Sequence, residues 1–122
     1  MRVYESAEDY LEAILIVGKR RSVVRSIDVA NELGFSKPSV SVAMKKLREG
    51  GHIEVDSEGY IHLLPTGREI AERIYERHRM LTDFFVYLGV SEAVAAADAC
   101  KVEHDLSAET FAKIKEHVRR TM

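Results

Sequence analysis

The sequence is short of cysteine: its 122 residues include one, Cys100. A single thiol excludes an internal disulfide framework. It fits a reducing cytoplasm, where a thiolate serves as a metal ligand or a nucleophile. No apolar run approaches the roughly 20 residues that a membrane span needs, and the opening stretch MRVYESAEDY lacks the apolar core of a signal peptide. We therefore expect a cytoplasmic protein with no membrane partner.

An excess of charge of one sign is also missing. The formal net charge is −2, from 18 lysines and arginines against 20 acidic residues. Such a chain is no general binder of polyanions, so contact with nucleic acid requires a local basic patch or a dimer that concentrates one. The hydrophobic fraction of 46% and the charged fraction of 31% are ordinary for a globular protein. The length suits one domain or two small units.

Hydrophobic periodicity predicts a mainly helical chain. A first helix is expected after Ser6, a candidate N-cap with Asp9 three residues later in a capping-box pattern. Its apolar positions, which follow a helical period, are Tyr10, Leu11, Ile14, Leu15 and Val17. A short turn then leads to a second helix from about Ser26, which Gly34 ends.

The following segment has the signals of a third helix over residues 37–49. Ser36 is its expected N-cap, and Pro38 lies in its first turn. Gly50 and Gly51 stop it. Its inner face is formed by the residues at i, i+4 and i+7, which are Val40, Met44 and Leu47.

Residues 52–64 change to a period of two. Ile53 and Val55 share one side of a first strand. Ile61 and Leu63 return in a second strand, after the turn-forming sequence DSEG. The pattern predicts a two-stranded hairpin.

Three more helices are expected after the hairpin. A long one follows residues 65–67 and ends at Gly89. Its apolar stripe consists of Ile70, Ile74, Leu81, Phe85 and Leu88. Ser91 is expected to cap a helix that reaches about Asp105, and Ser107 to cap the last helix. The inward-facing residues of that last helix are Phe111, Ile114 and Val118.

Three helices followed by a hairpin is the order of a winged helix-turn-helix. In the helix-turn-helix design the second helix of the motif lies in the major groove of DNA, with its N-terminal residues at base edges. Here that helix covers residues 37–49, and its lysines and serines are donors to phosphates and bases. If Lys45 and Lys46 are taken by themselves, a solvated helix face explains them equally well.

Two further features favour DNA binding. Four basic residues lie in the expected loop before the motif: Lys19, Arg20, Arg21 and Arg25. The hairpin, as a wing, is expected to place Ser57 near a phosphate. The expected DNA-binding residues are Arg25, Ser36, Lys37, Pro38, Ser39, Ser41, Lys45, Lys46 and Ser57.

The segment DACKVEHDLS combines three types of metal ligand. Cys100, Glu103 and His104 lie at i, i+3 and i+4, and such positions share one face of a helix. Asp9 and Glu12 lie at i and i+3 on the first helix. If these helices meet near His78 of the long helix, mixed oxygen, nitrogen and sulfur donors converge.

Such a donor set suits Fe²⁺, Mn²⁺, Co²⁺ or Zn²⁺. Its binding would couple the ion to the arrangement of the helices, as a metal sensor requires. Most of these candidate ligands also have a structural explanation. His78 suits a hydrogen-bonded core position, Asp9 a capping acid, Cys100 a small buried hydrophobe, and Glu103 and His104 an exposed helix surface.

The sequence resembles the DtxR/MntR family of metal-dependent bacterial repressors over essentially the whole chain. The resemblance is carried by SAEDYLEAI (6–14), SKPSVSVAMKKLREGG (36–51), LLPTGREIAERIYERHRML (63–81) and DACKVEHDLS (98–107). It implies a mainly α fold, with an N-terminal winged helix-turn-helix over residues 1–64 and a helical metal-binding and dimerisation domain over residues 65–122. In the iron branch of this family a small β-barrel forms a third domain. The sequence ends at Met122, before such a domain, and in this respect it is similar to the two-domain manganese branch.

The resemblance implies ligands from both branches of that family. Those of the manganese branch align with Asp9, Glu12, His78, Glu103 and His104, and its remaining glutamate aligns with Cys100. The iron branch has cysteine there, but methionine at the position of Asp9. The expected ligands are therefore Asp9, Glu12, His78, Cys100, Glu103 and His104. The expected cofactor is Mn²⁺ or Fe²⁺, with Co²⁺ and Zn²⁺ as alternatives in vitro.

The implied function is repression of metal-uptake genes by a homodimer that binds a palindromic operator. The ion would fix the angle and spacing of two recognition helices. Metal and DNA would then raise each other's affinity. The expected dimer interface includes Phe84, Phe85, Leu88 and the alanine-rich run 93–97.

Two other classes fit parts of the pattern. A metal-independent winged-helix regulator or protein-interaction module would bind its target whether or not a chelator is present. A small metalloenzyme needs an open coordination position and a substrate cleft. Six protein donors between short helices argue against a metalloenzyme, so we expect neither enzymatic activity nor a small-molecule substrate.

Overall fold

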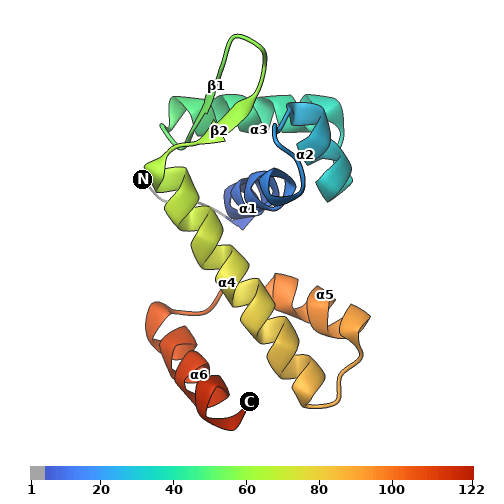
Figure 1. Ribbon diagram of the computed structural model, residues 1–122, viewed down its shortest axis with the longest axis vertical. Helices are drawn as coiled ribbons and strands as arrows, with labels where there is room; N and C mark the ends of the chain where they lie inside the picture. Colours follow the sequence, from blue (N-terminus) through green and yellow to red (C-terminus); the bar gives the residue numbers. More distant parts are fainter. Residues whose placement is uncertain (1–4) are drawn as a thin grey trace. The chain divides into compact units, whose positions relative to one another are not determined.

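The computed structural model describes residues 5–122, whose elements follow the predicted order. The helices and strands are α1 (Glu5–Arg20), α2 (Ser26–Leu33), α3 (Lys37–Glu49), β1 (Ile53–Val55), β2 (Ile61–Leu63), α4 (Pro65–Tyr87), α5 (Glu92–Val102) and α6 (Ala108–Thr121) (Figure 1). The predicted mainly α fold with a β-hairpin is confirmed. Among the described residues, no helix combines the length and apolar character that crossing a membrane requires.

The division between two compact units falls within α4. One unit ends at Arg73, and the other spans Ile74–Met122. The domain boundary predicted between residues 64 and 65 falls at the start of α4 and stays a prediction. The first turns of α4 belong to the N-terminal unit because they pack on it. Ala71 is fully buried, and Nη2 of Arg73 lies 2.9 Å from Oε2 of Glu8 in α1.

Helix α1 supplies much of the core of the N-terminal unit. Its predicted apolar positions are all buried, namely Tyr10, Leu11, Ile14, Leu15 and Val17. The prediction of Ser6 as the N-cap is wrong, because the helix has already begun at Glu5. Serine is also tolerated inside a helix, so the capping-box pattern does not by itself fix where this helix starts.

Local capping chemistry sets the ends of α2 and α3 as predicted. Gly34 ends α2 in the left-handed conformation, with φ of 69°, and its N–H donates to the carbonyl of Ala30. Ser36 caps α3, since its Oγ accepts from the N–H of Ser39 at 3.3 Å. The inner face of α3 is buried, as predicted, at Val40, Met44 and Leu47.

The wing is an antiparallel pair with a defined register. Ile53 lies opposite Leu63, and Val55 opposite Ile61. Ile53 and Ile61 are buried, so one face of the hairpin contributes to the core. The N–H of Ile61 also donates to the carbonyl of Val24 at 2.8 Å. This bond fixes the segment before α2 to the wing.

The C-terminal unit places α5 and α6 beside the second half of α4 (Figure 1). Its buried apolar residues are Ile74, Leu81, Ala95, Ala99, Phe111 and Val118. Ser107 caps α6 as predicted, accepting from the N–H of Thr110 at 3.1 Å. Two predictions are wrong here: α5 ends at Val102 rather than near Asp105, and Leu88 lies beyond α4 and is 62% exposed.

Both wrong predictions concern helix ends that are set by turns, and the pattern of apolar residues does not indicate these turns. The chain turns directly after Val102, before it enters α6. Gly89 adopts a φ of 107°, which a helix does not permit, so α4 stops ahead of it.

Candidate metal centre and DNA-binding surface

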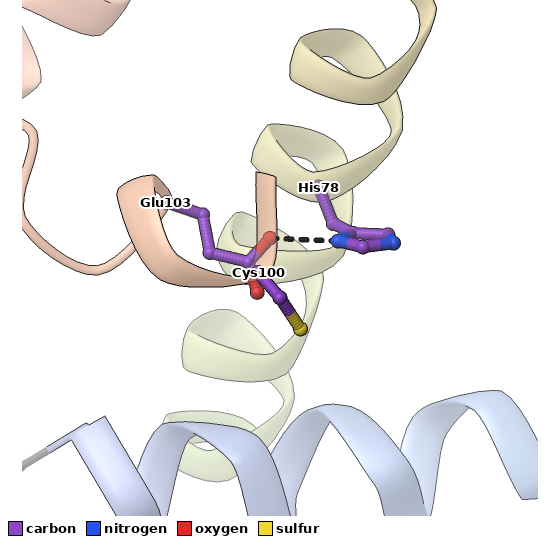
Figure 2. Close-up of side chains that lie close together, drawn as sticks. All are labelled: His78, Cys100 and Glu103. Atoms are coloured by element: carbon purple, nitrogen blue, oxygen red, sulfur yellow. Dashed lines mark hydrogen bonds and ion pairs between the residues drawn. The ribbon is translucent and has the colours of Figure 1, made fainter. Parts of the chain in front are cut away.

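Three predicted ligands of the C-terminal unit converge on one point. His78 projects from α4, Cys100 from the last turn of α5, and Glu103 from the residue that follows α5 (Figure 2). Each offers one ligand atom, and these three atoms all lie within 4.8 Å of one another. A divalent ion bound by nitrogen, sulfur and oxygen needs donors at about this mutual distance, since each bond is about 2.0–2.3 Å long.

The carboxylate of Glu103 is the centre of this cluster and is fully buried. Its Oε2 accepts from Nδ1 of His78 at 2.8 Å. Its Oε1 accepts no hydrogen bond from the described residues, and Nε2 of His104 lies 3.5 Å from it. The side chain of His104 is only 2% exposed. A buried carboxylate is costly unless a cation or donors compensate it, so a metal ion beside Oε1 would supply the missing compensation.

The end of α5 changes how the predicted ligands are presented. Glu103 keeps helical backbone angles, and its N–H donates to the carbonyl of Ala99. The spacing of Cys100 and Glu103 on one helical face is therefore preserved. His104 lies in the turn after the helix, not on the helix, so its place beside Glu103 depends on the fold of that turn.

A buried arginine, absent from the prediction, holds this turn. Nη1 of Arg77 donates to the carbonyl of Glu103 at 3.0 Å and to that of Leu106 at 2.7 Å. Its guanidinium carbon lies 5.2 Å from the centre of the Phe111 ring. Arg77 is 7% exposed. Its only sequence signal was its position next to His78, because its partners are backbone carbonyls that a side-chain pattern cannot indicate.

The two remaining predicted ligands lie on α1 in the N-terminal unit. Glu12 is 7% exposed, and Asp9 is half-buried. Their spacing of i and i+3 on a continuous helix gives them similar directions. Their use together with the C-terminal cluster stays a prediction.

The outward face of α3 carries six of the predicted DNA-binding residues. The exposed residues of this helix are Lys37, Pro38, Ser39, Ser41, Val42, Lys45, Lys46, Arg48 and Glu49. Val42 was not predicted, and its 56% exposure is unusual for a valine on a helix with a buried face. At 100° per residue it lies opposite the seam of Val40 and Met44. Such a side chain suits apolar contact with a thymine methyl group.

The four basic residues predicted in the loop before the motif are partly neutralised, and two of them do not lie in a loop. Lys19 and Arg20 belong to the last turn of α1, which corrects the prediction. Arg20 pairs with Glu32 of α2, and Arg21 lies 3.4 Å from Asp28. The helix continues to residue 20 because the apolar face of α1 extends to Val17 and supports another turn.

Arg25 lies beside the wing. Its Nη2 donates to the hydroxyl of Tyr60 at 3.1 Å, and its guanidinium carbon is 4.9 Å from the centre of that ring. The wing turn itself, which contains the exposed Ser57, is organised by Asp56. The carboxylate of Asp56 accepts from the backbone N–H groups of Glu58 and Tyr60, at 2.9 and 3.0 Å.

This fold and these sites define a class of protein: a winged-helix DNA-binding unit joined to a helical unit suited to a metal ion. Two family models match the chain. Residues 2–63 match the N-terminal DNA-binding domain of the iron-dependent repressors, and residues 64–121 match their metal-binding and dimerisation domain. The chain belongs to this family, and the resemblance to DtxR/MntR regulators is confirmed. The family is one of transcriptional repressors, not of enzymes.

Two related proteins are similar to this chain over most of its length. The transcriptional regulator MntR of Salmonella typhimurium is 35% identical over 107 residues, which cover 88% of this chain and 68% of the relative. An uncharacterized HTH-type transcriptional regulator of Methanocaldococcus jannaschii is 33% identical over 113 residues, covering 91% of this chain and 90% of the relative.

Solved structures show the same fold. A manganese-dependent transcriptional repressor in complex with manganese has a TM-score of 0.83 and 29% identity, and the match covers 92% of this chain and 52% of that one. The metal-dependent transcriptional regulator MtsR has a TM-score of 0.85 and 25% identity, covering 93% and 53%. The chain thus spans about half the length of these two structures.

Proposed function

We propose that this chain is a cytoplasmic, metal-dependent repressor of metal-ion homeostasis that senses Mn²⁺ or Fe²⁺ and binds a palindromic operator as a homodimer. The observation that carries the proposal is the buried carboxylate of Glu103 between two imidazoles and beside a thiol. In a chain of this family, such a cluster suits the ion that controls DNA binding.

Six side chains are proposed to hold metal. His78, Cys100, Glu103 and His104 belong to the C-terminal unit, and Asp9 and Glu12 to α1. The grouping within the C-terminal unit supports four of them, and the family resemblance supports the two on α1. An ion that draws ligands from both units would set the orientation of the DNA-binding unit, so its effect would reach α3.

The donor chemistry leaves a choice between a hard and a softer ion. Carboxylates at Asp9, Glu12 and Glu103 favour Mn²⁺, whereas the sulfur of Cys100 favours Fe²⁺ or Co²⁺. Replacing Cys100 with glutamate gives an all oxygen-and-nitrogen set. The preference should therefore move toward Mn²⁺ in that variant.

DNA contact is proposed for the outward face of α3, together with Arg25 and the wing residue Ser57. Lys45 and Lys46 are exposed and suit phosphate contact. Ser39 and Ser41, near the start of the helix, suit contact with base edges or phosphates. The exposed Val42 adds an apolar position for reading thymine.

The test is a DNA-binding titration under anaerobic conditions. A labelled duplex is first selected from a random library by the Mn²⁺-treated protein. Fluorescence anisotropy then measures the affinity of the protein for this duplex with Mn²⁺, Fe²⁺, Co²⁺, Zn²⁺ or EDTA present. We expect metal to raise the DNA affinity of the wild type by about tenfold or more. Glu103→Ala should abolish this response, whereas Glu109→Ala, on the exposed first turn of α6, should keep it.

Cys100→Glu should move the order of effective metals toward Mn²⁺; an unchanged order contradicts the role proposed for the sulfur. If the wild type binds the duplex equally with metal and with EDTA, the sensor proposal fails. The alternative, a metal-independent winged-helix regulator, is then the better reading.

A further inference from the structure

One buried polar junction connects α3, the wing and α4 in the N-terminal unit. His52 lies between α3 and β1 and is 7% exposed. Its N–H donates to the carbonyl of Leu47 in α3, and its own carbonyl accepts from the N–H of Leu64, both at 3.0 Å. The backbone of one residue is therefore bonded to α3 on one side and to the residue before α4 on the other.

The side chains of this junction join the same elements. The hydroxyl of Thr66, in the first turn of α4, donates to the carbonyl of Gly51 at 3.2 Å. Its oxygen lies 3.0 Å from Nδ1 of His52. Because the hydroxyl has one proton and gives it to Gly51, Nδ1 of His52 must be the donor in the second bond. The two bonds thus run in one direction, from His52 through Thr66 to Gly51.

Close packing fixes the approach of α4 to this point. A Cβ atom added to Gly67 would lie 2.1 Å from the carbonyl oxygen of His52. Only glycine permits this distance, so the first turn of α4 rests directly on the backbone of His52. An apolar side chain at position 52 would be enough for packing alone. The two directional hydrogen bonds of His52 and Thr66 also fix the rotation of the first turn of α4.

We infer that His52 and Thr66 are positioning residues that transmit the state of the metal site to the recognition helix. The inference rests on the proposed function. Helix α4 is continuous from Pro65 to Tyr87, and the metal-ligand candidate His78 lies on it. A change that metal binding imposes on α4 reaches α3 and the wing only if the start of α4 is held to them firmly. The junction of His52, Thr66 and Gly67 provides that hold.

Thr66→Val tests this role because valine keeps the shape of threonine but neither donates nor accepts a hydrogen bond. The measured quantity is the coupling factor, which is the ratio of DNA affinities with saturating Mn²⁺ and with EDTA. The DNA is the duplex selected by the Mn²⁺-treated wild type. We expect Thr66→Val to lower the coupling factor about fivefold, the scale of one net hydrogen bond. The affinity for Mn²⁺ without DNA should stay within about twofold of the wild type.

Two conservative variants serve as controls. Thr66→Ser keeps the hydroxyl, and His52→Asn keeps an N–H donor near the place of Nδ1, so both should retain most of the coupling. By reciprocity, the effect of DNA on Mn²⁺ affinity must fall in Thr66→Val by the same factor.

A purely structural role gives a different result. Loss of stability lowers DNA affinity equally with and without Mn²⁺ and leaves the coupling factor unchanged, and that outcome overturns the inference. Absence of coupling in the wild type instead overturns the proposed function, so the two failures are distinguishable.

Discussion

At the scale of single residues, the candidate metal centre depends on the fully buried carboxylate of Glu103. His78 meets one oxygen, and His104 faces the other at 3.5 Å. The residue types and their spacing around Cys100 were predicted from the sequence. The carbonyl contacts of Arg77 were not, since backbone partners far along the chain leave no local pattern.

Arg77 is expected to position the metal ligands. Arg77→Met removes the donor to the carbonyls of Glu103 and Leu106 while keeping a long apolar side chain. The turn that carries His104 then loses its anchor, so the affinity for Mn²⁺ should fall by about 10- to 100-fold, as outer-sphere changes do. Competition against a fluorescent chelator measures this affinity.

The neighbouring Arg79 provides a matched control. Its side chain is exposed and lies near the Tyr75 ring, with its guanidinium carbon 5.7 Å from the centroid. Arg79→Met removes the same charge from the same helix and should change the affinity for Mn²⁺ by less than about threefold. Equal losses in the two variants mean that charge, not the anchor, sets the affinity, and the positioning role is then wrong.

At the scale of elements, local chemistry determined most boundaries. Gly34, Ser36 and Ser107 end or begin helices as predicted, because each cap involves residues within five positions in sequence. The error at the end of α5 has a distant cause, because Arg77 of another helix holds the turn after Val102.

The wing turn gives a prediction about pH. The pKa of Asp56 lies below its ordinary value, chiefly because of the hydrogen bond from His62, and then because of the backbone N–H of Tyr60. A carboxyl whose pKa falls on folding stabilises the fold above its unfolded pKa, and this contribution is lost as the pH falls through the folded value. Asp56→Asn should therefore lower the melting temperature at pH 7, and the difference from the wild type should shrink below about pH 4.

Glu58→Gln is the control, since it removes an acidic charge from the same exposed turn but leaves the carboxylate of Asp56 in place. Its melting temperature should follow that of the wild type across the pH range. Thermal unfolding monitored by circular dichroism provides the comparison. A difference between Asp56→Asn and the wild type that stays constant from pH 7 to about pH 3 would count against this account of the wing.

At the scale of the whole molecule, the chain consists of two units whose functions are separate but proposed to be coupled. The N-terminal unit carries the proposed DNA-binding surface, and the C-terminal unit carries His78, Cys100, Glu103 and His104, the proposed metal ligands, together with exposed apolar residues. Tyr87, Leu88 and Val94 are 58%, 62% and 51% exposed. These exposed apolar residues suit the proposed dimer interface.

The proposed homodimer predicts the effect of a charge at this surface. Leu88→Glu replaces an apolar contact with a carboxylate that two-fold symmetry repeats on the partner, so the dimer dissociation constant should rise by at least about tenfold. Sedimentation velocity measures it. Val23→Glu alters an exposed apolar residue of the N-terminal unit and should leave the dimer intact. If Leu88→Glu remains as dimeric as Val23→Glu, the interface lies elsewhere.

The sequence by itself determined the order of the elements, the caps at Gly34, Ser36 and Ser107, the buried faces of α1 and α3, and the residue types of the candidate metal site. These depend on periodicity and on neighbours within a few positions, which the chain displays directly. Only the tertiary structure decided that Glu103 is fully buried between His78 and His104, that Arg77 holds their turn, and that His52 and Thr66 join α3 to α4. Burial and hydrogen-bond direction depend on groups that are distant in sequence and become neighbours only when the chain is folded.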